Sequence, residues 1–442
     1  MPEMYKSYWG VAWPAAIEGV LLNLMLLADL AMVGRLGIEQ AAAVGVVSQP
    51  KMILQMFSAA ISIAVTAIIA RRHGEHDIEG MNSGIKQALL FTFILYSFLV
   101  FWGLVFATPI VELAGANSEY RDFAAIYFQY ISISAFFKAL TAVLSAVQIG
   151  VGNTKVVLIA GFAGNIFNVV LNYVFIFGKF GFFEMGISGA GLATVIGNAI
   201  TFVMLLMSVM NGKNDINILR KGTFKFTIAW LRPMFEVGSN SFMEHLFERT
   251  GLFIFSRLIA GLGTVAMGTH HYCIIIWDLY YYFGVGMGQA SASFTGRSLG
   301  AKRADLAKMY IRVAQRIGLI ASLSASVLFL IMRFPMFQFL VSDKEVVSLG
   351  TSIVIIIAIL IVPQTQAQVT SGVLRGAGDN KFIAVYSLLI SAILRPLLAF
   401  VFSYGFGMGL GGMWISFLLD ELLKMCFAEF RIKQGIWLTK KV

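Results

Sequence analysis

The chain has 442 residues, of which 58% are hydrophobic and only 13% are charged. Because water-soluble domains carry roughly a quarter charged residues, this composition excludes an ordinary soluble protein and indicates one that lies in lipid. The net charge of +10 does not indicate nucleic-acid binding, since the basic residues lie mainly in polar segments beside apolar runs, as in the loops of a membrane protein.

Twelve apolar runs follow one another along the chain, each near the twenty or so residues that a helix needs to cross a bilayer. Most are continuous rather than alternating and are longer than the strands of an outer-membrane barrel, so helices are predicted. We therefore predict an all-α integral membrane protein with twelve transmembrane helices. The runs lie near 10–34, 44–70, 87–108, 123–148, 156–178, 187–210, 234–260, 270–296, 313–333, 346–372, 382–404 and 408–430.

The basic residues predict the orientation of these runs. With the amino terminus inside, 23 of the 33 Lys and Arg residues fall in inside loops and tails, and five fall in outside loops. Cytoplasmic loops of membrane proteins carry such an excess of positive charge. We therefore expect a multi-pass protein of the plasma membrane (the inner membrane of a bacterium) with both termini in the cytoplasm.

The chain repeats itself at an offset of 226 residues. Glu18 corresponds to Glu244, and the segment 150–155 corresponds to 376–381. Six runs per repeat is an even number, so both halves enter the membrane in the same direction, which is typical of transporters that rock one half against the other around a central cavity. The predicted domains are an N-terminal lobe (1–210), a cytoplasmic linker (211–232) and a C-terminal lobe (233–442).

Polar residues deep in the first half mark a candidate ion site, because an ionisable group inside a membrane costs roughly a few kcal/mol. Asp29 lies late in the first run, and Glu18 lies three helical turns earlier on the same face, where it could also bond a hydroxyl near a helix end. Asn168 and Asn172 share a helix face, and their amide oxygens suit sodium or a carboxylic acid, although hydrogen bonds between helices explain them equally well. Thr194 could add a hydroxyl ligand or belong to a packing face of small residues.

The second half carries candidate substrate-binding residues. Glu244 and Glu248 lie on one face of the seventh run, where a neighbouring arginine could neutralise a carboxylate. Asp278 and Tyr281 lie in an aromatic part of the eighth run, which could attract organic cations or form an interfacial belt. Gln364 makes the tenth run more polar and could line a cavity or form a packing hydrogen bond.

No motif of soluble enzyme chemistry is found in the sequence. There is no phosphate-binding loop, nucleophile elbow or paired-cysteine metal motif, and the spacing of His245 and Glu248 lacks the second histidine of a zinc helix. Asp420 and Glu421 are best explained as ion pairs between helices. We therefore expect no enzyme activity, no cofactor and no bound metal, and an ion gradient as the source of energy.

Five segments, taken together and in order, resemble the multidrug and toxic compound extrusion (MATE) family of transporters. The resemblance covers nearly the whole chain, and no single segment is decisive. The segments are Asp29 to Gly37, Asn168 to Gly178, Gly189 to Thr194, Gly288 to Ala301, and Leu374 to Lys381.

This resemblance implies a V-shaped, two-lobed antiporter with a central cavity that exports drugs and other small, often cationic compounds in exchange for protons or sodium. It implies a monomer in the lipid bilayer, with small-molecule substrates and no nucleic-acid partner. The residues that match the family's cation site are Asp29, Asn168, Asn172 and Thr194. The residues assigned to substrate binding are Glu18, Glu244, Glu248, Asp278, Tyr281 and Gln364. One branch of the family has an aspartate where Gln364 stands here, so coupling through Asp29 is preferred.

Three other classes of protein fit the sequence less well. Flippases of lipid-linked precursors, from the same wider superfamily, usually have about fourteen spans and strongly basic cavities. An intramembrane enzyme would need a catalytic set such as paired histidines or a serine dyad, and an ion channel would need a re-entrant filter loop.

Overall fold

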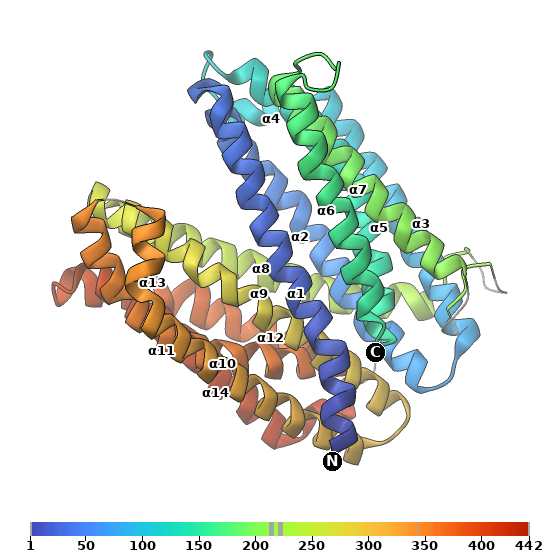
Figure 1. Cartoon of the computed structure of the whole chain (residues 1–442). Helices are drawn as coiled ribbons and strands as arrows, with labels where there is room; N and C mark the ends of the chain where they lie inside the picture. The colour runs from blue at the N-terminus through green and yellow to red at the C-terminus, as the bar shows by residue number, and fades with distance from the viewer. Residues whose placement is uncertain (1, 212–215, 220–223, 342, 441–442) are drawn as a thin grey trace. The chain divides into compact units, whose positions relative to one another are not determined.

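The computed structural model describes residues 2–211, 216–219, 224–341 and 343–440, and over these ranges it contains helices and no strand (Figure 1). Twelve long helical segments coincide with the twelve predicted runs, which confirms the predicted all-α class and helix number. In chain order the elements are α1 (Pro2–Val33), η1 (Gly34–Leu36), α2 (Ile38–Gly74), α3 (Ile78–Val105), α4 (Ala107–Leu113), α5 (Arg121–Gly150), α6 (Thr154–Phe177), α7 (Gly186–Met210), α8 (Ile228–Ala260), α9 (Thr264–Gly300), α10 (Ala304–Leu340), α11 (Lys344–Ala377), α12 (Asn380–Ser387), η2 (Leu388–Leu394), α13 (Arg395–Phe400), η3 (Val401–Gly405), α14 (Gly409–Gln434) and η4 (Ile436–Thr439).

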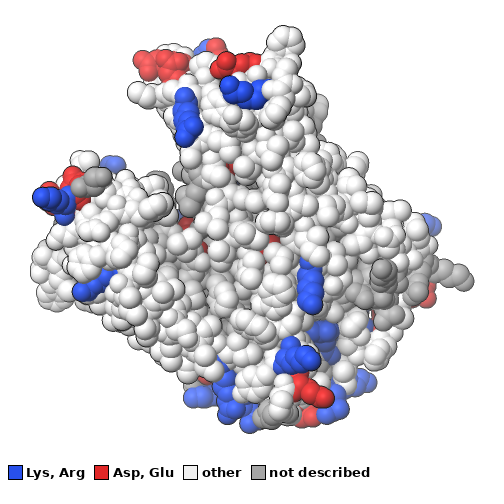
Figure 2. All heavy atoms as spheres, in the orientation of Figure 1, with Lys and Arg blue, Asp and Glu red and all other residues white. Residues whose placement is uncertain are grey.

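Eight of the helical segments are long and apolar enough, by length and composition, to cross a membrane. They are α2, α3, α5, α6, α7, α10, α11 and the segment Asn380–Gly405. On the face drawn in Figure 2, most charged side chains lie near the ends of helices, and the middles of the helices are mostly uncharged. This distribution is the one expected for helices whose middle parts lie in lipid.

The chain forms two compact units, each of which has its own internal packing. The N-terminal unit is Leu21–Gly238, in which α2 and α7 pack against α5, and α6 packs against α7. The C-terminal unit is Ser239–Val442 together with Met1–Val20, and in it α9, α10 and α14 all pack against α11. The helices α1 and α8 each contribute residues to both units.

The predicted linker lies only partly within the described residues. Its described part is held to α3 by polar side chains, because the Asn217 amide donates to Asn82 Oδ1 at 3.1 Å and the Thr227 amide donates to Gln87 Oε1 at 2.9 Å. The helix α8 then begins at Ile228, inside the predicted linker. The basic residues Lys213, Arg220, Lys221 and Lys441, which enter the count of inside charges, lie outside the described residues.

Several helices extend beyond the apolar runs that predicted them. The first run begins near residue 10, but α1 begins at Pro2, because hydropathy marks only the part of a helix that matches lipid. Side-chain caps fix other helix starts: Asp77 accepts from the Gly80 amide at 2.9 Å at the start of α3. At the other end, Gly178 ends α6 in the left-handed conformation with φ 60°, which a residue with a Cβ adopts only with strain.

The eleventh predicted run is a helix with two π-helical parts rather than one regular helix. In place of a single helix over 382–404, the structure has α12, the π segment η2, the short helix α13 and the π segment η3. Pro396, at the start of α13, has no amide hydrogen to donate, which explains a local change of hydrogen-bond pattern. Such π turns are frequent at functional sites, and Arg395, described below, directly follows the first of the two.

In each unit, a glycine lets the sixth long helix approach the fifth closely. A Cβ on Gly189 of α7 would lie 2.7 Å from the backbone carbon of Phe175, and a Cβ on Gly412 of α14 would lie 2.7 Å from that of Phe402. Both contacts are shorter than atoms of a real side chain allow. The two halves therefore share this backbone approach, which small residues permit in membrane helices.

Candidate ion and substrate sites

Asp29 and Asn172, both predicted for the cation site, are in direct contact in the N-terminal unit. Asn172 Nδ2 of α6 donates to Asp29 Oδ1 of α1 at 2.6 Å. Asn172 is only 1% exposed, and its carbonyl Oδ1 is buried with no hydrogen-bond partner among the described residues. A carboxylate and a buried amide oxygen without a partner are together able to hold a proton or a sodium ion.

Asn168 and Thr194, the other two predicted ligands, form a second polar pair between α6 and α7. Asn168 Nδ2 donates to Thr194 Oγ1 at 3.4 Å, and Thr194 Oγ1 donates to the Ala190 carbonyl at 2.8 Å. The two asparagines lie one turn apart on α6, so the four predicted residues form one polar strip in the N-terminal unit, hereafter the N-half site.

A polar cavity lies beside the N-half site, with Thr194 in its wall. Lys51 of α2 and Lys138 of α5 also line it, and Lys51 interacts electrostatically with Asp29. The sequence alone does not bring these two lysines together, because it does not show that α2 and α5 pack side by side. We call this space the lysine cavity.

Glu18 shares the helix α1 with Asp29, but the two carboxylates belong to different compact units. Glu18 lies in the C-terminal unit and is partly buried, whereas Asp29 lies in the N-terminal unit. Their common helical face is therefore no evidence of a common site.

The predicted residue Glu248 belongs to a buried cluster of charges in the C-terminal unit. Lys424 Nζ of α14 lies 2.6 Å from Glu248 Oε1, 3.0 Å from Asp420 Oδ2 and 3.5 Å from Glu421 Oε1. Only 8% of the Lys424 side chain is exposed. One ammonium group is thus shared by three carboxylates.

Arg395 adds a second cation to this cluster. Its Nη1 donates to Asp420 Oδ2 at 3.2 Å, and its Nη2 donates to the Glu248 carbonyl at 3.2 Å. The guanidinium also lies 5.3 Å from the ring centre of Phe417. We call Glu248, Arg395, Asp420, Glu421 and Lys424 the C-half charge network.

Two predictions about this network have different outcomes. Asp420 does form an ion pair between helical segments, with Arg395, whereas Glu421 pairs with Lys424 of its own helix. Lys424 was counted among the charges of inside loops, and this assignment is wrong, because the residue is buried within α14. The count overlooked that a lysine surrounded by carboxylates can remain charged inside a protein.

The remaining residues predicted for substrate binding in this half are not members of the C-half charge network. Glu244 accepts a hydrogen bond from Arg375 of α11. Asp278 interacts electrostatically with Arg249, and the ring of Tyr281 lies 4.7 Å from that of Trp277. Gln364 is 1% exposed, and neither polar atom of its side chain has a hydrogen-bond partner among the described residues.

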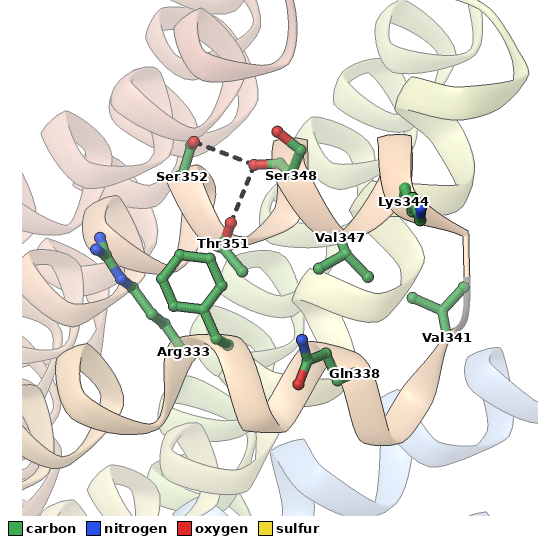
Figure 3. Close-up of a pocket in the computed structure, with 9 residues that line it drawn as sticks. Arg333, Gln338, Val341, Lys344, Val347, Ser348, Thr351 and Ser352 are labelled. Atoms are coloured by element: carbon green, nitrogen blue, oxygen red, sulfur yellow. Dashed lines mark hydrogen bonds between the residues drawn. The ribbon is translucent and has the colours of Figure 1, made fainter.

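A larger and more open hollow lies where α10 ends and α11 begins (Figure 3). It encloses about 1140 Å³ of empty space, including the adjoining solvent, and Arg333 and Lys344 supply its charges. Its hydroxyl groups serve the helix itself, since Thr351 and Ser352 donate to the Ser348 carbonyl at 3.0 and 3.2 Å. None of the predicted site residues is among the described residues that line it.

Membrane-length helices with buried carboxylates, amides and lysines define the class of the protein as a multi-pass membrane transporter. The sequence pattern of the MatE family matches residues 14–174 and 241–401, one match in each half. The chain therefore belongs to the MATE family, which confirms the family that the sequence resembled.

Relatives with curated descriptions match over almost their full length. An uncharacterized transporter of Bacillus subtilis, YisQ, is 28% identical over 440 residues, which cover 98% of this chain and 95% of that protein. A probable multidrug resistance protein of Thermotoga maritima, NorM, is 25% identical and covers 100% of this chain and 95% of its own length.

Solved structures agree in fold. An outward-facing structure of a multidrug resistance MATE family transporter of the MOP superfamily superposes with a TM-score of 0.91 at 20% identity. The match covers 98% of this chain and 96% of that one. At this level of identity the likeness shows the fold alone.

Proposed function

We propose that this protein is a cation-coupled antiporter that exports small organic compounds, often cationic, across the plasma membrane by alternating access. Its relatives named as multidrug resistance proteins support a drug-like cargo. The observation that carries the proposal is the contact of Asp29 with Asn172, an ionisable group beside a buried amide oxygen without a partner among the described residues.

The coupling ion, a proton or sodium, binds at the N-half site. Asp29 supplies the charge, Asn172 Oδ1 supplies a hard oxygen, and Asn168 and Thr194 complete the polar surroundings. Neutralising Asp29 weakens the hydrogen bond from Asn172, which is stronger to a carboxylate than to a neutral acid. Ion and cargo then oppose each other's binding in one state of the carrier, which is all that exchange requires.

The C-half charge network is a poorer candidate for coupling. Glu248 and Asp420 are already paired with Lys424, and Asp420 also with Arg395. An added cation would have to displace the ammonium group of Lys424, which is part of the chain and cannot leave. This occupancy favours coupling in the N-terminal unit.

In this proposal both termini lie in the cytoplasm, because, with the buried Lys424 left out of the 23, that orientation puts 22 Lys and Arg residues inside and five outside. A flippase of lipid-linked precursors is the alternative from the wider superfamily. The twelve long helical segments of the described chain fit the antiporter better than the fourteen or so spans of such flippases.

The test is replacement of Asp29 by Asn in a host that lacks its own efflux pumps. We expect drug resistance to be lost while the amount of protein in the membrane is unchanged. The matched control is Asp305→Asn, because Asp305 is exposed and pairs only with Arg303 among the described residues. Unchanged resistance in the Asp29 variant would remove this residue from the mechanism.

Transport into inverted membrane vesicles separates the two coupling ions. Uptake of an ethidium-like dye is measured with a pH gradient alone and with a sodium gradient alone. Flux that follows neither gradient would sink the antiporter assignment itself.

A further inference from the structure

The lysine cavity is formed within the N-terminal unit by α2, α3, α5 and α7. It takes in about 390 Å³ of empty space, including the adjoining solvent. Its polar walls include Lys51, Gln55, Ser134, Lys138 and Asn198. Among the described residues that line it, none is acidic.

The two lysines give the cavity an excess of positive charge. Lys51 and Lys138 are close enough to repel each other, and Asp29 is the carboxylate that interacts with Lys51. Lys138 has no ion-pair partner among the described residues. Two ammonium groups therefore share one carboxylate, and a charged group inside a membrane protein needs a counter-charge.

Lys138 is exposed and Lys51 is half-buried in the cavity, and neither side chain can reach a membrane surface by extending along its own helix. Lys138 lies seventeen residues after the start of α5 and twelve before its end, which is about 25 Å and 18 Å of helix. Lys51 lies thirteen residues after the start of α2, or about 20 Å. A lysine side chain covers only a fraction of these distances, so the usual explanation of membrane lysines at helix ends does not apply.

The other polar groups of the cavity are mostly occupied. Asn198 Nδ2 donates to Ser134 Oγ at 2.7 Å, and Thr194 Oγ1 donates to a carbonyl of its own helix. The strongest free donors that remain are the two ammonium groups, each with three N–H bonds. An acceptor with negative charge matches these donors.

We propose that the lysine cavity binds a carboxylate of the transported compound. The cargo that fits is a small organic zwitterion, whose cationic body agrees with the cationic cargo proposed above and whose acid group pairs with Lys138 and Lys51. This inference rests on the proposed export function, because it names the class of compound exported.

Matched acid–ester dye pairs test the inference directly. Rhodamine 110 and its methyl ester, rhodamine 123, differ only in the carboxylate, as do rhodamine B and its ethyl ester. Binding to the purified transporter is measured by fluorescence polarisation without any ion gradient. We expect each acid to bind the wild type more tightly than its ester.

The variants Lys138→Met and Lys138→Arg identify the group responsible. Loss of one charge-assisted contact should weaken acid binding by about tenfold or more in Lys138→Met and leave ester binding within about twofold. Lys138→Arg should keep the acid preference. Melting temperatures of both variants check that they fold.

Two results would overturn the inference. One is that no acid binds the wild type more tightly than its ester, whether or not the esters bind. The other is that Lys138→Met weakens acid and ester equally, which would mean a structural role. Failure of the export function would instead appear as absent flux in vesicles, so the two failures are distinguishable.

Discussion

The same pair of helices occurs in both halves of the chain but carries different chemistry. In the N-terminal unit, α6 and α7 meet through Gly197, where an added Cβ would lie 2.8 Å from the Cβ of Asn168. In the C-terminal unit, the corresponding segments meet through Arg395 and Asp420, which form a buried ion pair. The repeat has kept the backbone approach and changed the side chains.

Because of this difference in side chains, the N-half site can accept an added cation, whereas the C-half charge network already contains the ammonium group of Lys424. Asp29 accepts its short hydrogen bond from a neutral amide and forms no ion pair among the described residues, with Lys51 interacting only at longer range, so an outside cation can neutralise it. Glu248 and Asp420 are held by Lys424, a cation built into the chain. In the proposed mechanism, equivalent places in the repeat serve as an ion site in one half and as a structural network in the other.

The largest expected effect comes from breaking the ion pair of the C-terminal unit. Asp420→Asn leaves Arg395 buried without its carboxylate, which should destabilise the protein by about 3–5 kcal/mol, seen as a lower melting temperature. In the N-terminal unit, Asn168→Ala removes only a neutral hydrogen bond and should cost about 1 kcal/mol. The double variant Arg395→Met, Asp420→Leu should recover most of the loss, and additive losses would contradict the comparison.

The next prediction removes the internal cation. Lys424→Gln leaves Glu248, Asp420 and Glu421 with Arg395 as their nearby cation, so sodium should now bind there. Sodium at a hundredfold excess over its dissociation constant should stabilise the variant by about 2.7 kcal/mol. Melting temperature is measured in sodium and in a large organic cation of equal ionic strength. Equal temperatures in the two salts would show that Lys424 does not fill a cation site.

A smaller effect is expected at the N-half site. Asn172→Leu removes the donor that lies 2.6 Å from Asp29, and a hydrogen bond to a charged group contributes about 1.5–3 kcal/mol. Affinity for the coupling ion should therefore change by roughly ten- to a hundredfold, measured as the ion concentration that gives half-maximal dye transport. Asn165→Leu, on the same helix, is the control, and equal effects of both changes would remove Asn172 from the site.

The sequence predicted the positions of the helices, and the residues that share a helix face, better than it predicted which distant residues contact one another. Apolar run length gave all twelve long helices, and the spacing of Asn168 and Asn172 put both on the N-half site. Contacts between distant residues were harder: Asp29 meets Asn172 across 143 positions, and Glu248 meets Lys424 across 176. Lys424 was wrongly assigned to an inside loop, because the count of basic residues assumes that a lysine of a membrane protein lies in contact with water. The π segments of the eleventh span went unpredicted, since a lone proline signals a kink without specifying it.

The last prediction concerns what the two halves have in common. Gly189→Ala and Gly412→Ala each put a methyl group 2.7 Å from backbone of the neighbouring helix, so the helices must separate slightly. Each change should destabilise the protein by about 1–3 kcal/mol, and by similar amounts, because backbone cannot move aside as a flexible side chain can. Gly411→Ala is the matched control, since an added Cβ there meets nothing within 4 Å. If only one of the two close-packed glycines were sensitive, the close backbone approach would not be a structural requirement common to both halves. The two halves could then no longer be compared as the same helix packing with different side chains.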